Sequence, residues 1–381
     1  MKKLTLYLFL LTMISACKER YELPYSGPAT GYLVIDGVIN SGQGPTTLRL
    51  TRTLALVDSV GFRNETGANV RVEGEDNSSQ QIIEIGNGVY RANQLTFNPN
   101  IKYRLHINSS NGKEYMSDYV AVLKTPPIDG INWERPADGV MIFIDTHDPL
   151  GNTQYYRWEY EESWEFHSAF MTSLKYKLRP NGVPYDVEGR DPVETQQMYT
   201  CYSGGLSTNL LIGSSAKLSR DTIHLPLLFV PDGSWKLSVL YSLLVRQYAV
   251  SKAGYEFLQR MKKNTEQVGS LFDAQPSELR GNVQCLTDPN ELVIGFVDIA
   301  EAQEKRIFIS RADVHPWNYR QACYEEDILN NPDTLEYWST FIPTSVSLYS
   351  QRGDTLRVFA GSAECVDCRT RGTHIKPSYW P

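Results

Sequence analysis

Lys102-Tyr103-Arg104-Leu105-His106-Ile107 is the stretch that shows the fold class most clearly. Its polar and apolar residues alternate without a break, so Tyr103, Leu105 and Ile107 fall on one face and His106 on the other. A period of two is typical of a β-strand with one buried face. We therefore expect a strand here, with His106 in solvent and not acting as a ligand.

Similar short runs surround this strand between residues 31 and 125. Two turn dipeptides, Asn87-Gly88 and Asn111-Gly112, separate strand-like runs and tolerate positive φ. Counting the central strand, about seven short strands fit this segment, a number and spacing typical of an immunoglobulin-like β-sandwich. The runs are residues 32–39, 46–53, 70–73, 81–85, 89–92, 102–107 and 115–122.

The strand pattern stops at Lys124-Thr125-Pro126-Pro127, because proline donates no hydrogen bond to a sheet. We place a domain boundary there and expect a second β-rich domain over residues 126–381. Its clearest strand has alternating apolar residues over 235–245, whereas residues 166–219 are expected to be irregular. A helical insertion is expected near 251–265, with Ser251 as its N-cap. The predicted fold class is mainly β.

The first residues have the features of an export signal. Lys2 and Lys3 precede an apolar run over 4–14, which is shorter than the roughly 20 residues that span a bilayer as a helix. The sequence Ser15-Ala16-Cys17 then resembles a lipobox, with cleavage between Ala16 and Cys17 and lipidation of Cys17. We expect a lipoprotein signal peptide over 1–17, a tether over 18–30 and a firm acyl anchor in the membrane.

Composition and motifs limit the classes of function. The chain has 381 residues and a formal net charge of −7, which argues against a nucleic-acid partner. The sequence contains no His-Glu-x-x-His motif, no phosphate-binding glycine loop and no Gly-x-Ser-x-Gly elbow. We therefore expect no enzyme, no cofactor and no metal. A turn with Asp145, His147 and Asp148 leaves a metal site conceivable, but acidic turns before strands are common.

Five cysteines follow Cys17, and an exported protein matures where disulfides persist. Cys365 and Cys368 have neither the strand-helix context of a redox site nor the second Cys or His pair of a zinc site. We expect each to bond to a distant partner, because a bond between them would be strained. Cys323 is the candidate for one and Cys201 for the other, which leaves Cys285 as a buried free thiol.

Four short motifs of Asp, then Ser or Thr, then an apolar residue resemble the acceptor of general O-glycosylation in Bacteroidota. The acceptor positions are Ser59, Thr222, Thr334 and Thr355. Because the motif is short and one or two matches are expected by chance, it supports export and placement in surface loops only weakly.

Three blocks resemble a Bacteroidota outer-membrane lipoprotein family, the domain of unknown function 4249. They are LVIDGVIN at 33–40 with GP at 44–45 and LRLTRT at 48–53; YSLLVRQY at 241–248 with Tyr255, GSLFD at 269–273, QP at 275–276 and GN at 281–282; and CVDCR at 365–369 with KPSYW at 376–380. The family more often has Phe where Tyr379 stands. The resemblance implies a lipoprotein encoded beside TonB-dependent transporters of the starch-utilisation type, and no catalytic residue carries over.

The resemblance leads to one main expectation of function and an alternative. We expect a non-enzymatic accessory of a TonB-dependent transporter that aids substrate capture or uptake, docking through residues 166–219 and the 251–265 helix. The alternative is a free-standing surface lipoprotein for glycan binding or adhesion, and an envelope hydrolase is a weaker third. We expect an outer-membrane location, and Lys18-Glu19 with Glu22 loosely resembles a signal for cell-surface display.

Overall fold

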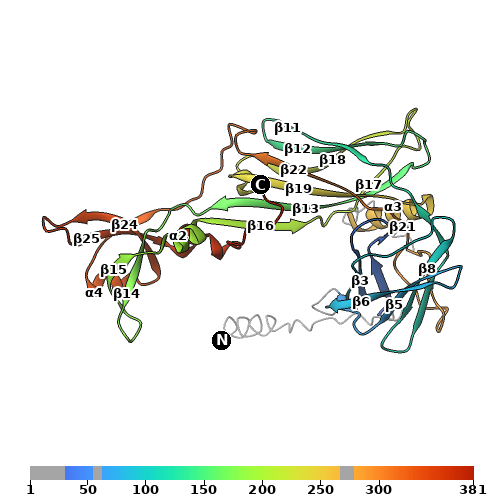
Figure 1. The fold of residues 1–381 in the computed structure, drawn as a ribbon, viewed down its shortest axis with the longest axis horizontal. Coiled ribbons are helices and arrows are strands. Elements are labelled where there is room, and N and C mark those ends of the chain that lie inside the picture. Colours follow the sequence, from blue (N-terminus) through green and yellow to red (C-terminus); the bar gives the residue numbers. More distant parts are fainter. Residues whose placement is uncertain (1–30, 55–61, 267–278) are drawn as a thin grey trace, which may run out of the picture.

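The computed structural model describes residues 31–54, 62–266 and 279–381. The predictions for Ala16, Cys17, the tether and Ser59 lie outside these residues, as do residues 269–273 of the second family block. The described chain is mainly β, as the sequence predicted, and forms three parts along a long axis (Figure 1). None of the helices in these ranges is long and apolar enough to cross a membrane.

The first unit is a curled twelve-stranded sheet. Its alternating residues fold inward as expected, so Tyr103, Leu105 and Ile107 are buried. The Asn87-Gly88 turn is confirmed, with φ of 52° and 71° at its two residues. In sheet order the main path runs β1 (Leu33–Asp36), β3 (Thr46–Thr53), β7 (Val89–Ala92), β6 (Ser79–Gly86), β5 (Asn69–Gly74), β8 (Lys102–Asn108), β10 (Val120–Leu123), β21 (Ile299–Ala300) and β2 (Ile39–Asn40), with β4 (Phe62–Asn64), β9 (Glu114–Ser117) and β20 (Val283–Cys285) beside it.

Part of the chain beyond residue 125 completes this first unit. Strand β20 pairs with β9, and β21 lies parallel between β10 and β2. The Asn282 side chain makes the pair of hydrogen bonds that a neighbouring strand would make. It donates to the Val297 carbonyl at 2.9 Å and accepts from the Val297 amide at 2.8 Å. Residues 282–300 therefore pack in the first unit, although the sequence placed them in the second domain. Pairing between such distant segments leaves no local periodic signal.

The middle unit consists of two facing sheets. One has the order β11 (Ile128–Glu134), β12 (Gly139–His147), β18 (Thr222–Pro231). The other has the order β16 (Thr200–Leu206), β13 (Tyr155–His167), β19 (Leu240–Ala249), β22 (Gln303–Ser310), with β17 (Leu211–Ser214) also on β13. Trp158 and Gln247 are fully buried between the sheets, and the indole donates to the Gln247 Oε1 atom at 2.8 Å.

Two local predictions for this unit have different outcomes. The predicted helix is present as α3 (Lys252–Glu266), and the Ser251 Oγ atom accepts from the Gly254 amide at 3.0 Å, so the N-cap is confirmed. The strand predicted over 235–245 is wrong in its first half, because Trp235–Leu237 is a short 3-10 helix, η1, and β19 begins at Leu240. The Ser234 side chain accepts from the Lys236 amide and caps this turn.

A third part projects from the middle unit, at the left of Figure 1. We define the projecting unit as residues 171–190 and 324–362. It has its own small core, which contains Val187, Ile328, Leu335, Val358 and Ala360. Its elements are β14 (Leu174–Leu178), β15 (Pro184–Gly189), β23 (Glu325–Leu329), α4 (Pro332–Tyr337), β24 (Phe341–Tyr349) and β25 (Thr355–Ser362).

The prediction that residues 166–219 are irregular is wrong. That segment contains β14, β15, α2 (Pro192–Tyr199), β16 and β17. Its glycines and prolines serve a hairpin turn and helix starts, since Gly182 has a φ of 83° and Pro192 lies at the first turn of α2. The density of turn residues therefore reflects short elements, not an irregular loop.

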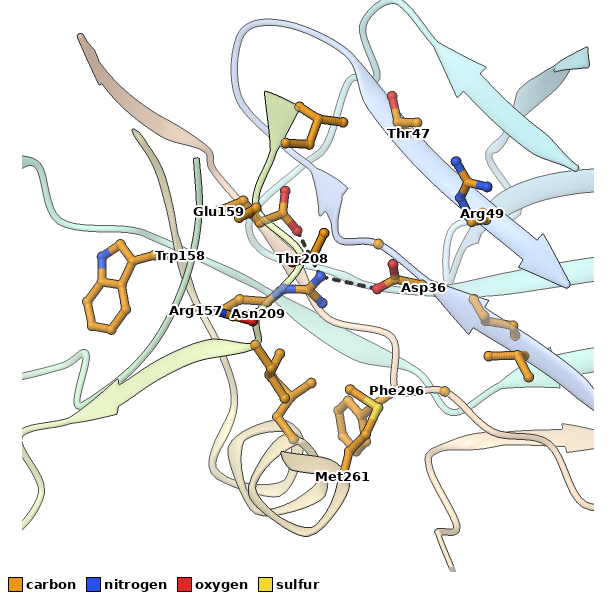
Figure 2. A pocket seen from close by; sticks show the side chains of 18 of the residues that line it. Asp36, Thr47, Arg49, Arg157, Trp158, Glu159, Thr208, Asn209, Met261 and Phe296 are labelled. Carbon is orange, nitrogen blue, oxygen red and sulfur yellow. Dashed lines mark hydrogen bonds and ion pairs between the residues drawn. The ribbon is translucent and has the colours of Figure 1, made fainter. Parts of the chain in front are cut away.

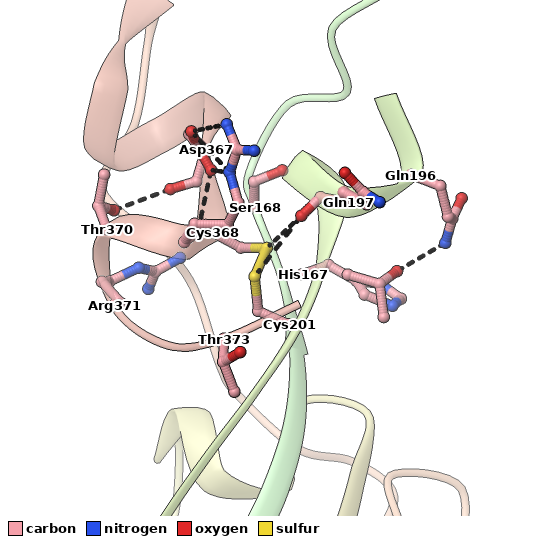
Figure 3. The surroundings of a disulfide bond; sticks show 12 residues. His167, Ser168, Gln196, Gln197, Cys201, Asp367, Cys368, Thr370, Arg371 and Thr373 are labelled. Atoms are coloured by element: carbon pink, nitrogen blue, oxygen red, sulfur yellow. Dashed lines mark hydrogen bonds and ion pairs between the residues drawn. A yellow bond between two sulfur atoms is a disulfide. The ribbon is translucent and has the colours of Figure 1, made fainter. Parts of the chain in front are cut away.

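Two disulfides cross the base of the projecting unit, a region that we call the neck. Figure 3 shows one of them, between Cys201 and Cys368. Cys201 bonds to Cys368, next to the short helix η2 (Cys368–Thr370), and Cys323 bonds to Cys365, in α5 (Ala363–Val366). Cys285 is buried and free. The predicted two bridges and the odd thiol are confirmed. The Cys323–Cys365 bridge joins the chain that enters the projecting unit to the chain that leaves it, and the Cys201–Cys368 bridge joins two segments that both return from it.

Candidate functional site

A cleft of about 580 Å³ lies where the first unit meets the five-stranded sheet of the middle unit and α3 (Figure 2). We call it the inter-unit cleft. Strand β1 and the start of β3 supply one wall, β13 and the loop over 206–210 supply another, and α3 closes one end. Cavities of this size are typical of small-molecule and peptide sites in proteins.

Arg157 is the central charged residue of the cleft. Its Nη2 atom donates to Asp36 Oδ1 of the first unit at 3.2 Å and to Glu159 Oε1 on its own strand at 2.8 Å. The Arg157 side chain is only 12% exposed, whereas that of Asp36 is 62% exposed. Burial opposes the charge of Arg157, but Glu159 and Asp36 outweigh it and raise its pKa. The guanidinium therefore joins the two units as a permanent cation.

Strand alternation explains why these charges gather on one face. Arg157 and Glu159 alternate along β13 with Tyr156 and Trp158, which point into the core of the middle unit. In register, Glu159 lies opposite Arg246 of β19, and the Arg246 Nε atom donates to Glu304 at 2.6 Å. The face of the sheet that looks toward the first unit is thus ion-paired and polar.

The opposite side of the cleft is apolar. Phe257, Leu258 and Met261 come from α3, and Ile294 and Phe296 come from the segment that completes the first unit. The rings of Phe257 and Phe296 lie 5.9 Å apart. Helical spacing explains the set, because residues three and four apart share a helix face. A ligand in the cleft would therefore meet charge on one side and hydrocarbon on the other.

Arg49 lines the first-unit wall and differs from the other cleft cations. It is exposed and makes no ion pair or side-chain hydrogen bond with any residue in the described ranges. Figure 2 shows it on the β3 side of the cleft, apart from the group formed by Asp36, Arg157 and Glu159. Arg49 is thus available to an acidic group of an incoming ligand.

The sequence-predicted sites do not gather at this cleft. Thr222 is exposed at the start of β18, Thr334 is half-buried in α4 and Thr355 is half-buried at the start of β25. The glycosylation predictions at these positions stay predictions.

The turn with Asp145, His147 and Asp148, where a metal site was conceivable, does not bring these three side chains together. His147 pairs with Asp129 at 2.7 Å, and Asp145 pairs with His224 at 2.6 Å. Asp148 instead accepts from backbone amides, including that of Leu150 at 2.9 Å. Within the described ranges, no three His, Cys, Asp or Glu residues are grouped as metal ligands.

The sequence analysis missed the cleft, although two signals for it were present. Residues 156–160 read Tyr-Arg-Trp-Glu-Tyr, with opposite charges between large aromatic residues. Such a pattern indicates a strand whose outer face is ion-paired, not merely solvated. Asp36 also lies in the first block of the family resemblance, beside Gly37. What the sequence could not supply was the contact between these two segments.

Comparisons with known proteins give one specific result. No curated protein matches the chain. Weak structural likeness is found to a structure of a manganese lipoxygenase of Gaeumannomyces graminis with part of the zonadhesin of Komagataella pastoris (10% identity, 58% of this chain and 89% of that chain, TM-score 0.18). Similar likeness is found to chitinase ChiA74 from Bacillus thuringiensis (12% identity, 55% of this chain and 30% of that chain, TM-score 0.16). Neither likeness carries an argument about this fold.

The family model of the domain of unknown function DUF4249 matches residues 18–306. The match covers the first unit, the inter-unit cleft and most of the middle unit, and it ends within β22. It ends before the third block of the resemblance, at 365–380, which stays a resemblance. Because the matched range spans most of the sequence, the chain belongs to the DUF4249 family.

Proposed function

We propose that this protein is a non-enzymatic, lipid-anchored accessory of a TonB-dependent outer-membrane transporter, and that it aids the capture or uptake of the transporter's substrate. Cys17 carries the anchor in this proposal, and the protein faces the cell surface. Several acyl chains hold a protein firmly at the membrane. Confinement in the plane of the membrane then raises the effective concentration of a neighbouring transporter, so a weak contact suffices.

The observation that carries the proposal is the exposed apolar surface at the ends of the projecting unit. The hairpin of β24 and β25 exposes Leu348, Tyr349 and Leu356, by 49%, 60% and 43%. The hairpin of β14 and β15 exposes Leu178, by 57%, and α4 exposes Tyr337, by 80%. Apolar residues gathered at one end of a soluble protein favour a protein interface there.

The charge and shape of the projecting unit support docking to a protein partner. Its outer face carries the Arg357–Asp327 ion pair at 2.9 Å beside exposed Phe359. Aromatic residues with a polar surround are typical of protein interfaces. A stable interface buries about 1,600 Å² in total, so both hairpins and α4 would have to take part.

The inter-unit cleft supplies the second surface that an accessory of this kind needs. Its mixed lining fits a ligand with both an acidic group and an apolar part, because Arg49 is free while α3 and Phe296 present hydrocarbon. The two surfaces lie in different parts of the molecule. A substrate held in the cleft would leave the hairpin ends free for the transporter.

The experiment is to capture the tagged protein from native membranes in mild detergent. The proteins bound to it are then identified and quantified by mass spectrometry. The proposal predicts a barrel transporter in stoichiometric amount. A lone lipoprotein that binds cells or glycans would instead support the alternative, a free-standing surface lipoprotein for glycan binding or adhesion. A Cys17→Ala variant should lose palmitate labelling and the transporter together. If that variant is still labelled, the anchor is not at Cys17.

A further inference from the structure

A second cavity, of about 460 Å³, lies at the neck. We call it the neck cavity. The end of β13, the residue after β22 and the loop over 319–323 form its walls, and the Cys323–Cys365 bridge lies against it. It is distinct from the inter-unit cleft, because the two cavities share no lining residue.

Two arginines give the neck cavity its charge. Arg311 and Arg320 both line it, both are exposed, and neither guanidinium makes an ion pair or hydrogen bond with another described residue. The lining residues, all of them within the described part of the chain, include no Asp or Glu. Other arginines near the neck are engaged: Arg371 donates to the Gln321 Oε1 atom at 3.2 Å, and Arg369 pairs with Asp367 at 2.7 Å.

The two free guanidinium groups make this site positively charged, although the whole chain has a net charge of −7. Guanidinium binds carboxylate, sulfate and phosphate groups through paired N–H donors. The carboxylate of Glu165, two residues before the lining residue His167, is already engaged. It accepts from the Trp380 indole at 3.0 Å and lies 3.5 Å from His167 Nε2. The two arginines are therefore left for an external anion.

Aromatic rings line the same cavity. Tyr199 stacks on His167 with ring centroids 4.5 Å apart, and Tyr319 and Phe170 also line the walls. Gln321 and Ser168 add amide and hydroxyl groups. Aromatic faces pack against the C–H face of a sugar ring, and amides and hydroxyls bond to its hydroxyl groups. The cavity therefore combines aromatic faces with charged and hydrogen-bonding groups.

We propose that the neck cavity binds an anionic sugar, that is, a sugar ring carrying a carboxylate or a sulfate group. Arg311 and Arg320 bind the anionic group, and Tyr199, Tyr319 and Phe170 pack against the ring. The site does not depend on the transporter partner, so its failure would leave the proposed function untouched. It differs from the inter-unit cleft, where one free arginine, Arg49, faces apolar side chains of α3.

The test is titration of the purified lipid-anchored protein in detergent with glucuronate, glucose 6-sulfate, glucose and benzoate. We expect glucuronate or glucose 6-sulfate to bind saturably, and more weakly as salt rises. Whether glucuronate or glucose 6-sulfate binds shows whether the natural ligand carries a carboxylate or a sulfate group. Glucose should bind at least about tenfold more weakly, because the charged hydrogen bonds are lost.

The Arg311→Gln and Arg320→Gln double variant should weaken binding of the anionic sugar by at least about tenfold. Both positions are exposed, so the variant should fold normally, which near-ultraviolet circular dichroism checks. Arg352→Gln is the matched control, because Arg352 lies exposed in the hairpin turn of the projecting unit and should leave binding unchanged. Equal binding of glucose, binding of benzoate alone, an unaffected double variant or no saturable binding at all would each overturn the proposal.

Discussion

Glu73 shows how single residues depart from what alternation along a strand suggests. Its carboxylate accepts from Arg71 Nε at 2.7 Å and Arg104 Nη2 at 2.9 Å, and His106 Nδ1 lies 2.8 Å away. Strand alternation correctly placed His106 on the polar face of β8. The expectation that it is solvated is wrong, since His106 is only 5% exposed beneath these neighbours. A polar face is not always a solvated face when β5 and β8 place opposite charges side by side.

The ionised form of Glu73 should stabilise the first unit. Partial burial disfavours the charge, but the bonds from Arg71, His106 and Arg104 outweigh it and lower the pKa of Glu73 from 4.5 to about 2. Because the folded-state pKa is depressed, the stabilisation is complete above pH 4.5 and is lost as the pH falls toward 2. Glu73→Gln should therefore cost roughly 1–3 kcal/mol at pH 7 and much less near pH 2.

The measurement is urea unfolding of the parent protein and the Glu73→Gln variant, followed by circular dichroism between pH 7 and pH 2. Glu336→Gln is the matched control, because Glu336 is exposed and its side chain makes no hydrogen bond or ion pair within the described ranges. A Glu73→Gln cost that stays constant over this pH range would show that charge at this position does not stabilise the fold.

Secondary-structure elements were predictable where local signals agree with tertiary contacts. The strands of the first unit follow alternation and Gly turns, and α3 follows its cap and apolar face. Prediction failed over 235–237, where alternation continues through a 3-10 turn whose Leu237 is nevertheless fully buried. It failed again over 166–219, because short elements between turns have too few residues to show a period. The cysteines were more informative than the periodicity there, since they predicted two bridges and a free Cys285, although not which partner Cys365 and Cys368 each take.

The disulfides at the neck should hold α2 and η2 in place. Removing Cys201–Cys368 with a double alanine substitution opens a loop that spans 167 residues of sequence. We expect a loss of about 2–4 kcal/mol in the free energy of unfolding. Amide hydrogen exchange should rise in α2 and in residues 363–370 before it rises in the first unit.

Cys285→Ala is the control for this experiment, because it removes a buried thiol of the first unit and leaves both bridges intact. It should lower overall stability without faster exchange at the neck. Unchanged exchange in α2 and residues 363–370 after loss of the Cys201–Cys368 bridge would mean that packing alone holds the neck.

At the scale of the whole molecule, the sequence predicted a mainly β chain and an N-terminal sandwich but not how the parts meet. Strands β20 and β21 reach the first unit from residues 283–300, and the Arg157–Asp36 ion pair joins residues 121 positions apart. The inter-unit cleft is a product of these long-range contacts and therefore has no motif. The projecting unit is likewise built from two separate segments of chain, which only the three-dimensional structure brings together.

The central claim of this account is that the projecting unit docks the protein on a transporter. The most direct measurement compares the amount of transporter captured by a Leu348→Ser, Tyr349→Ser and Leu356→Ser variant with the amount captured by the parent protein. The matched control is Ile83→Ser with Ile85→Ser, which removes exposed side chains from β6 at the opposite end of the molecule (66% and 61% exposed). Because buried aromatic and aliphatic anchors dominate binding, we predict at least about a tenfold loss of captured transporter for the hairpin variant and none for the control. Full recovery of the transporter by the hairpin variant would contradict the claim.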